Sequence, residues 1–438
     1  MEIIQGFSKL TREEKIEVLL KHNAVSQEMV NKLELFRHHD HNYQKQFEKI
    51  SENVISNYIL PYSIVPNVKI NDKIYFVPLV TEESSVVAAA SMAAKFWAGR
   101  GGFKTKVLSE TKIGQIHFTW KGSYDKLIEN DDRLKIHLVT SVRHLTQRMY
   151  SRGGGLGNIE IISFADKIID YYQIKVDFNT ADAMGANFIN SCLEQMSKAL
   201  VDFINNNFSG EETFCEIIMS ILSNYTPECI VECAVECNKT ELLPMTGGLS
   251  LENYIKKFET AVQIAQMDVY RAVTHNKGIF NGIDAVLIAT GNDFRAVEAC
   301  GHAYASRTGQ YTSLSCCENS ATDFRFILKV PMAIGTVGGT TRVHPIAGFS
   351  LEILNNPSAA GLMEIAAAVG MANHFAAITA LITKGIQKGH MKMHLSQILV
   401  HLQANENEVK QAVGYFADKE ISFNAASEYL SLLRLQSL

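Results

Sequence analysis

The stretch IKVDFNTADAMGANF, residues 174–188, decides the fold that we expect for this chain. Its first five residues alternate like a strand, the turn 182–187 follows, and a long helix runs to about residue 208. The small residues of the turn leave its backbone open to a ligand, and the amides at a helix N-terminus attract phosphate. A tightly packed turn without a ligand is the alternative interpretation.

Further strands and helices are expected on the N-terminal side of this stretch. Apolar residues alternate at 113–120 and 159–164, a helical segment covers about 125–149, and a triple glycine at 153–155 predicts a turn. Strand, helix, strand, strand and helix in this order are typical of a ferredoxin-like arrangement. We therefore predict a small α+β domain over residues 104–214. It is of a non-Rossmann kind, because neither G-x-G-x-x-G nor a Walker lysine is present.

The remaining sequence predicts a larger and more helical part. A strand is expected at 73–80, and helices are expected at 86–98, 251–273 and 358–383. A chain of 438 residues is too long for one ordinary core. We expect an α/β (α+β) protein whose large, mostly helical substrate domain, residues 1–103 and 215–380, carries the small domain as an insertion. Residues 381–438 are expected to form a small, mobile, helical C-terminal lid domain.

Charge and cysteine content exclude several classes of protein. The net charge of −5 gives no concentrated basic face for a nucleic acid. Eight cysteines are too few for a disulfide scaffold in a chain of this length. Cys229, Cys233 and Cys237 are spaced four apart and lack the C-x-x-C pair of a metal site. We predict that they pack in a core as reduced thiols, that the protein is cytoplasmic, and that it binds no metal.

Neither a signal peptide nor a membrane span is expected. The N-terminus has early acidic residues and no long apolar core. The most apolar window, 366–382, is interrupted by Asn373 and His374, which favours a buried helix over a membrane-spanning one.

Several polar residues stand where they could carry chemistry. The loop 335–339, GTVGG, suits a phosphate or a nicotinamide, although a plain turn is equally compatible. Lys277 and Asp293 could pair in a cleft, where a lysine stabilises an oxyanion, or form a surface salt bridge. Glu83 could face the same cleft or cap a helix. His390 could donate a proton to a leaving group, or be merely structural.

In this order, the segments resemble those of class II 3-hydroxy-3-methylglutaryl-coenzyme A (HMG-CoA) reductases of the bacterial type. The resemblance covers nearly the whole chain. It is carried by LPYSIVPNVKIN at 60–71, VPLVTEESSVVAAAS at 77–91, RGGG at 152–155, DAMGAN at 182–187, SILSN at 220–224, YRAVTHNKGIFNGIDAVLIATGND at 270–293, the 335–339 loop and GIQKGHMKMH at 385–394.

The resemblance implies a role for eight side chains. Four are implied to be catalytic, namely Glu83, Lys277, Asp293 and His390, and four to hold the acyl portion of HMG-CoA, namely Ser85, Asn224, Arg271 and Asn281. The sequence departs from the family pattern at Ser84, where proline is common, and at 373–374, where Asn-His replaces Gln-Asn. These departures could alter contacts with the substrate.

The implied reaction uses two hydrides. The thioester takes the first and becomes a mevaldyl-CoA hemithioacetal, whose growing negative charge Lys277 stabilises. His390 then protonates the departing CoA thiolate. The aldehyde takes the second hydride, with Glu83 as the acid if its pKa is raised. Asp293 is expected to join Lys277 and Glu83 in one network that sets which proton is available.

The cofactor is expected to be NADPH, with NADH possible. Family members that prefer NADH resemble one another in an acidic residue shortly before the triple glycine, and the segment 143–148 has two arginines instead. An arginine can pair with a 2′-phosphate, although these arginines could also be a solvated helix face. The expected cofactor-binding residues are Asp182, Ala183, Met184, Gly185, Asn187, Arg143, Thr146, Arg148, Gly335, Gly338 and Gly339.

The resemblance also implies partners and a pathway. HMG-CoA, mevalonate and CoA are the expected ligands, in the mevalonate pathway of isoprenoid biosynthesis, and a homodimer or an assembly of dimers is the expected state. The alternatives are catabolic, NAD-dependent oxidation of mevalonate by the same site and a noncatalytic acyl-CoA-binding homologue. The four implied catalytic residues argue against the noncatalytic alternative.

Overall fold

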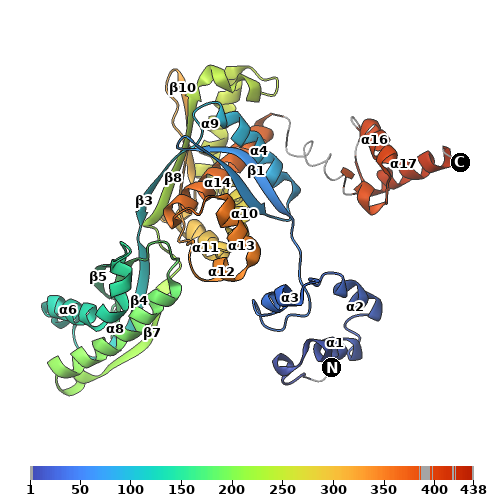
Figure 1. Cartoon of the computed structure of the whole chain (residues 1–438). Helices are drawn as coiled ribbons and strands as arrows, with labels where there is room; N and C mark the ends of the chain where they lie inside the picture. Colours follow the sequence, from blue (N-terminus) through green and yellow to red (C-terminus); the bar gives the residue numbers. More distant parts are fainter. Residues whose placement is uncertain are drawn as a thin grey trace.

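The structure is a computed structural model that describes residues 3–383, 385, 395–396, 398–416, 419 and 421–436. In this part of the chain, buried apolar side chains gather in three separate cores. One core lies in the small sheet unit, which projects from the large part in Figure 1, one lies in the large part, and one lies near the C-terminus. We propose that each of these cores belongs to one of the three predicted domains.

The small unit is a four-stranded antiparallel sheet with helices packed on it. Its strands are β4 (Lys112–Trp120), β5 (Gly155–Ser163), β6 (Tyr171–Asn179) and β7 (Cys215–Ser223), and they lie in the order β5-β6-β4-β7. Its helices are α5 (Tyr124–Glu129), α6 (Asp131–Ser141), α7 (Arg143–Tyr150) and α8 (Ala186–Asn207). This βαββαβ arrangement is the ferredoxin-like topology that the sequence predicts.

The ends of this unit differ from the predicted range of 104–214. Strand β3 (Lys104–Glu110) pairs with a strand of the other sheet, whereas β7 pairs with β4. A single residue, Thr111, separates β3 from β4, so the alternating pattern runs on while the chain passes between sheets. Such a pattern shows that a strand is present but does not show its partner. We propose 112–223 in place of 104–214.

The large part combines a second sheet, a hairpin and most of the helices. The sheet has the order β3-β8-β10-β9, with β8 (Cys229–Asn238), β9 (Ser315–Cys317) and β10 (Asp323–Pro331), and β1 (Tyr62–Ile70) pairs with β2 (Lys73–Val80). The helices are α4 (Ser84–Ala98), α9 (Leu251–Met267), α10 (Val269–Ala289), α11 (Phe294–Ala305), α12 (Thr340–Val343), α13 (Pro345–Ile353) and α14 (Ala359–Ile382).

Helix α14 is the centre of the large core. It packs against α4, α10 and β8, and it lies in the middle of the large part in Figure 1. By length and composition it could cross a membrane, yet 78% of its most apolar window is buried inside the protein. This burial agrees with the predicted core helix.

Two expectations about the large part have different outcomes. The predicted helix 251–273 is wrong, because the chain breaks between α9 and α10. There the side chain of Asp268 accepts hydrogen bonds from the backbone amides of Tyr270 and Arg271 and so caps α10. Cys229, Cys233 and Cys237 are buried in the core along β8, as ordinary packing predicts.

Short helices lie at both ends of the chain, apart from the two sheets in Figure 1. Thr11 and Glu14 form a capping box ahead of α1. The terminal helices are α1 (Arg12–Lys21), α2 (Gln27–Glu34), α3 (His41–Glu48), α16 (Glu406–Tyr415) and α17 (Phe423–Gln436). Three 3₁₀ helices complete the described elements: η1 (Phe7–Lys9), η2 (Gly210–Thr213) and η3 (Lys239–Met245).

Candidate active site

A cavity of about 580 Å³ opens between α4, α10 and α14, and we call it the helix cavity. It collects predicted catalytic and acyl-binding residues from segments almost 200 positions apart. These residues are Glu83, Ser85, Arg271, Lys277 and Asn281. Lys277 and Asn281 are four residues apart on α10 and therefore share one face of that helix.

Glu83 and Lys277 meet in the helix cavity. Glu83 stands just before α4, and its Oε2 accepts a hydrogen bond from Lys277 Nζ at 2.8 Å. Asn281 Nδ2 donates to the same oxygen at 3.4 Å, and Ser85 Oγ donates to Oε1 at 3.1 Å. The Lys277 side chain is 58% exposed, so its ammonium can reach a bound ligand. A cation fixed beside a carboxyl group can stabilise an oxyanion and supply a proton nearby.

The inner wall of the helix cavity contains residues that sequence reasoning did not select. His374 Nε2 lies 2.9 Å from His275 Nε2, which is also 2.8 Å from Ser315 Oγ. Burial, and to a lesser extent the nearby Arg271 cation, lowers the pKa of His275 to about 3, so this imidazole is neutral. Asn373 Nδ2 donates to the carbonyl of Gly278 at 2.7 Å. In the sequence, the only sign of these inner-wall residues was the pair Asn373-His374, two polar residues inside an otherwise apolar helix.

A second cavity, of about 730 Å³, lies between loops of the two sheets, and we call it the turn cavity. It joins the two small-residue loops that the sequence separates by about 150 positions. Ala183 forms an isolated β-bridge with Val337, and the backbone carbonyl of Asp182 accepts from the amide of Thr336 at 2.9 Å. Asp182 Oδ1 accepts from the amide of Ala359 at 2.8 Å, which links the turn to α14.

The backbone of the turn cavity fits a phosphate-bearing dinucleotide. A Cβ on Gly335 would lie 2.4 Å from the amide nitrogen of Met184, so only glycine allows this approach of two chains. Gly338 and Gly339 have positive φ values of 84° and 55°, with open space where side chains would stand. Gly185, at φ 94°, precedes the N-terminus of α8, whose amides attract an anion.

Asp293 lies in the turn cavity, whereas Glu83 and Lys277 line the helix cavity. Its Oδ1 accepts from the amide of Ala296 at 3.2 Å and pairs with Arg295 Nε at 3.2 Å. The expected network of Glu83, Lys277 and Asp293 therefore stays a prediction. His390 lies outside the described residues, as do its neighbours 386–394, so the predicted lid role of 381–438 stays a prediction.

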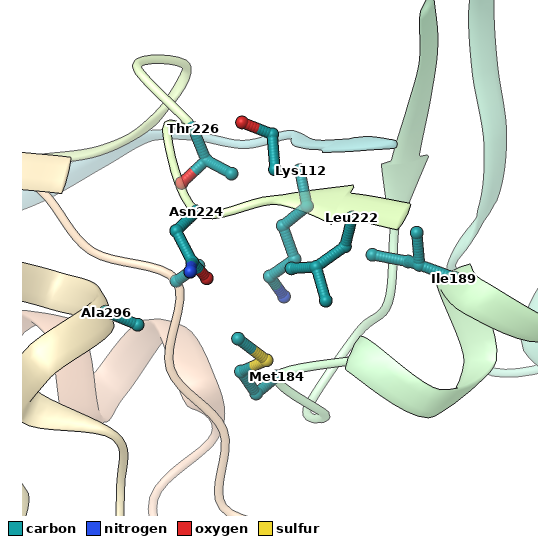
Figure 2. Close-up of a pocket in the computed structure, with 9 residues that line it drawn as sticks. Lys112, Met184, Ile189, Leu222, Asn224, Thr226 and Ala296 are labelled. Carbon is teal, nitrogen blue, oxygen red and sulfur yellow. The ribbon is translucent and has the colours of Figure 1, made fainter. Parts of the chain in front are cut away.

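The remaining predicted residues fall in three places. Asn224 lines a small cavity with Lys112 and Met184 between the two sheets (Figure 2). Arg143 and Arg148 are exposed on α7. Thr146 is only 1% exposed, and its hydroxyl donates to the Val142 carbonyl, so its predicted contact with the cofactor stays a prediction that this burial does not support. The sequence did not show that Thr146 lies on the buried face of α7.

Comparisons with known proteins agree along almost the whole chain. A family model described as hydroxymethylglutaryl-coenzyme A reductase matches residues 13–395. The 3-hydroxy-3-methylglutaryl-coenzyme A reductase of Archaeoglobus fulgidus is 34% identical over 98% of this chain and 94% of its own length. The probable reductase of Borreliella burgdorferi is 34% identical, over 93% of this chain and 90% of its own length.

Solved structures give the same result. A reductase from Streptococcus pneumoniae is 36% identical, with a TM-score of 0.71 over 98% of this chain and 99% of that chain. A class II reductase from the same organism, described as bound to NADPH in open conformations, has 36% identity and a TM-score of 0.70 over 86% of this chain and 99% of that chain. This chain therefore belongs to the hydroxymethylglutaryl-coenzyme A reductase family, in its class II branch.

Proposed function

We propose that this protein reduces (S)-HMG-CoA to mevalonate and free CoA, in the mevalonate pathway of isoprenoid biosynthesis. Two hydrides and two protons are added for each thioester cleaved. The observation that carries the proposal is the Glu83–Lys277 pair, at 2.8 Å, inside a 580 Å³ cavity that also holds the predicted acyl-binding side chains Ser85, Arg271 and Asn281. Family membership independently supports the same reaction.

The side chains of the helix cavity have distinct proposed tasks. Arg271 provides a cation for the free carboxylate of the substrate, and Ser85 and Asn281 offer further hydrogen bonds. Lys277 faces the thioester carbonyl and stabilises negative charge on its oxygen in the first reduction. Glu83 holds Lys277 in place and gives a proton to the aldehyde oxygen in the second reduction. His390 remains the proposed donor to the CoA thiolate.

The turn cavity is the proposed cofactor site. The 182–187 turn and the 335–339 loop would hold the nicotinamide dinucleotide, which supplies the hydride when bound. NADPH is the proposed favoured form, because α7 offers Arg143 and Arg148 and carries no acidic residue of its own. The relative from Streptococcus pneumoniae is described as bound to NADPH, which supports this choice.

A cytoplasmic homodimer, or a larger assembly of dimers, is the proposed working form. Within one chain, Lys277 and Asp293 line different cavities. A second copy that places its Asp293 and Asn224 beside the first copy's Lys277 would complete the proposed catalytic set. The separation of these residues supports a shared site.

The test is a side-by-side assay of NADPH and NADH oxidation that depends on HMG-CoA. We expect two cofactor molecules to be oxidised for each CoA thiol released, with mevalonate as the product and NADPH preferred. A clear NADH preference would contradict the cofactor proposal and favour the catabolic direction. No turnover with either cofactor would refute the reductase proposal.

A further inference from the structure

Lys112 is a buried lysine to which the proposed mechanism gives no role. It is the first residue of β4, close to the point where the chain passes from the large sheet to the small one. Its side chain is 3% exposed, and burial lowers its pKa. Transfer of an ammonium group from water to such a place is costly unless acceptors satisfy it.

Both acceptors of Lys112 come from one short turn. Nζ donates to Thr180 Oγ1 at 2.6 Å and to the backbone carbonyl of Ala183 at 2.9 Å. Thr180 Oγ1 in turn donates to the same carbonyl at 2.6 Å, so the three groups form a closed triangle. The turn has unusual backbone angles, with φ 46° at Ala181 and 94° at Gly185. Its geometry therefore depends on contacts that it makes outside itself.

The same turn forms one wall of the proposed cofactor site. Figure 2 shows Lys112 reaching into the space between Asn224, Leu222 and Met184. Ala183 and Met184 themselves line the turn cavity. A displacement of the Ala183 carbonyl would move these residues and the start of α8 together, because they follow it directly in the chain.

We propose that Lys112 is a positioning residue of the cofactor site, whose ammonium group fixes the 180–185 turn in the form that the dinucleotide meets. This inference rests on the proposed function in one respect, which is that the ligand of the turn cavity is NADPH. A general contribution to folding would act on the whole small unit, whereas this contact acts on one turn.

The test compares Lys112→Met with wild type in NADPH binding and in hydrogen exchange of the 180–187 segment. Met fills the same volume without a donor, and the adjoining cavity of about 10 Å³ leaves no room for a guanidinium. We expect the Kd for NADPH, from cofactor fluorescence without HMG-CoA, to rise about ten- to hundredfold. Exchange at 180–187 should quicken, while the KM for HMG-CoA changes less than about threefold.

Two further variants separate positioning from stability. Lys112→Gln keeps an N–H donor and should recover part of the NADPH affinity, whereas Lys106→Met, at an exposed site on β3, should match wild type. If Lys112→Met does not fold, Thr180→Val removes the hydroxyl of the same triangle and should give the same rise in Kd.

The outcomes distinguish this inference from the proposed function. An unchanged Kd for NADPH in the folded Lys112 variant would overturn the positioning role. So would an equal loss of NADPH and HMG-CoA binding together with faster exchange throughout the small unit. If wild type binds NADPH and that binding depends on Lys112, but HMG-CoA is not reduced, the positioning role holds and the proposed function fails.

Discussion

The helix cavity and the turn cavity are built by different physical means. Side chains of three packed helices make the first, and its working groups are a carboxyl, an ammonium and a guanidinium held on rigid backbone. Loops between the two sheets make the second, and its surface is mostly backbone exposed by glycine and alanine. The helix cavity therefore offers a ligand charged side chains, whereas the turn cavity offers it backbone amides.

The difference teaches where each kind of substitution should act. Loss of one charged side chain in the helix cavity removes a chemical function and leaves the helices in place. Addition of one methyl group in the turn cavity changes the path of the backbone and leaves the chemistry intact. The predictions below test this separation of chemistry from cofactor binding.

The largest expected effect is that of Lys277→Ala in the helix cavity. Loss of an oxyanion-stabilising donor lowers kcat by about 10²- to 10³-fold. We expect this loss in HMG-CoA-dependent NADPH oxidation, with the Kd for NADPH within about twofold of wild type. Lys256→Ala, at an exposed site on α9, is the matched control and should be fully active. A normal kcat in the Lys277 variant would show that the reduction does not take place in the helix cavity.

Gly335→Ala should have the opposite profile. The added Cβ would lie 2.4 Å from the amide nitrogen of Met184, so the loop and the turn must separate. We expect the unfolding free energy to fall by about 1–3 kcal/mol and the Kd for NADPH to rise about tenfold or more. The measurements are urea unfolding and cofactor fluorescence.

The control for this substitution is Gly348→Ala in α13, where no heavy atom lies within 4 Å of the new Cβ. It should leave NADPH binding unchanged and can raise helix stability by up to about 1 kcal/mol. Unaltered NADPH binding in Gly335→Ala would mean that the close approach of the two loops does not shape the cofactor site.

A third prediction concerns the neutral histidine beneath the helix cavity. Burial lowers the pKa of His275 to about 3, against about 6.5 in the unfolded chain. Between these values the unfolded chain binds a proton that the folded chain does not, so the unfolding free energy falls as the pH falls below about 6.5. From pH 7 to pH 5 this residue should account for about 2 kcal/mol of lost stability.

Urea unfolding of wild type and His275→Gln at pH 7 and pH 5 measures this loss. Other groups titrate in both proteins, so the difference between them reports His275 together with its contact to His374. Wild type should lose about 2 kcal/mol more than the variant. Equal losses would show that the imidazole is not held neutral in the helix cavity.

The smallest expected effect is that of Arg148→Gln on α7, at an exposed residue that we propose to bind the cofactor. An exposed arginine that pairs with a 2′-phosphate contributes about 1 kcal/mol, so the KM for NADPH should rise less than about tenfold. The KM for NADH, which lacks this phosphate, should stay the same. A parallel rise for both cofactors would indicate a loss of α7 structure instead.

Sequence reasoning found most of the elements because their patterns are local. The strand 73–80 and the helix that begins near Ser84 follow from alternation and from a small-residue run. The helix 251–273 failed because Asp268 can both end one helix and cap the next, while the apolar period continues past it. The partner of β3, in contrast, is a strand more than 100 positions further along the chain.

The sequence alone determined the chemical groups, the family resemblance and the ferredoxin-like order of the small unit. Tertiary structure alone decided that Glu83 meets Lys277, that Asp293 lies in the other cavity, and that Thr146 is buried. It also decided that Lys112 holds the turn before α8. The physical reason is that the periodicity of a helix or strand depends on neighbouring residues, whereas the contacts and the burial of a side chain depend on how distant segments pack.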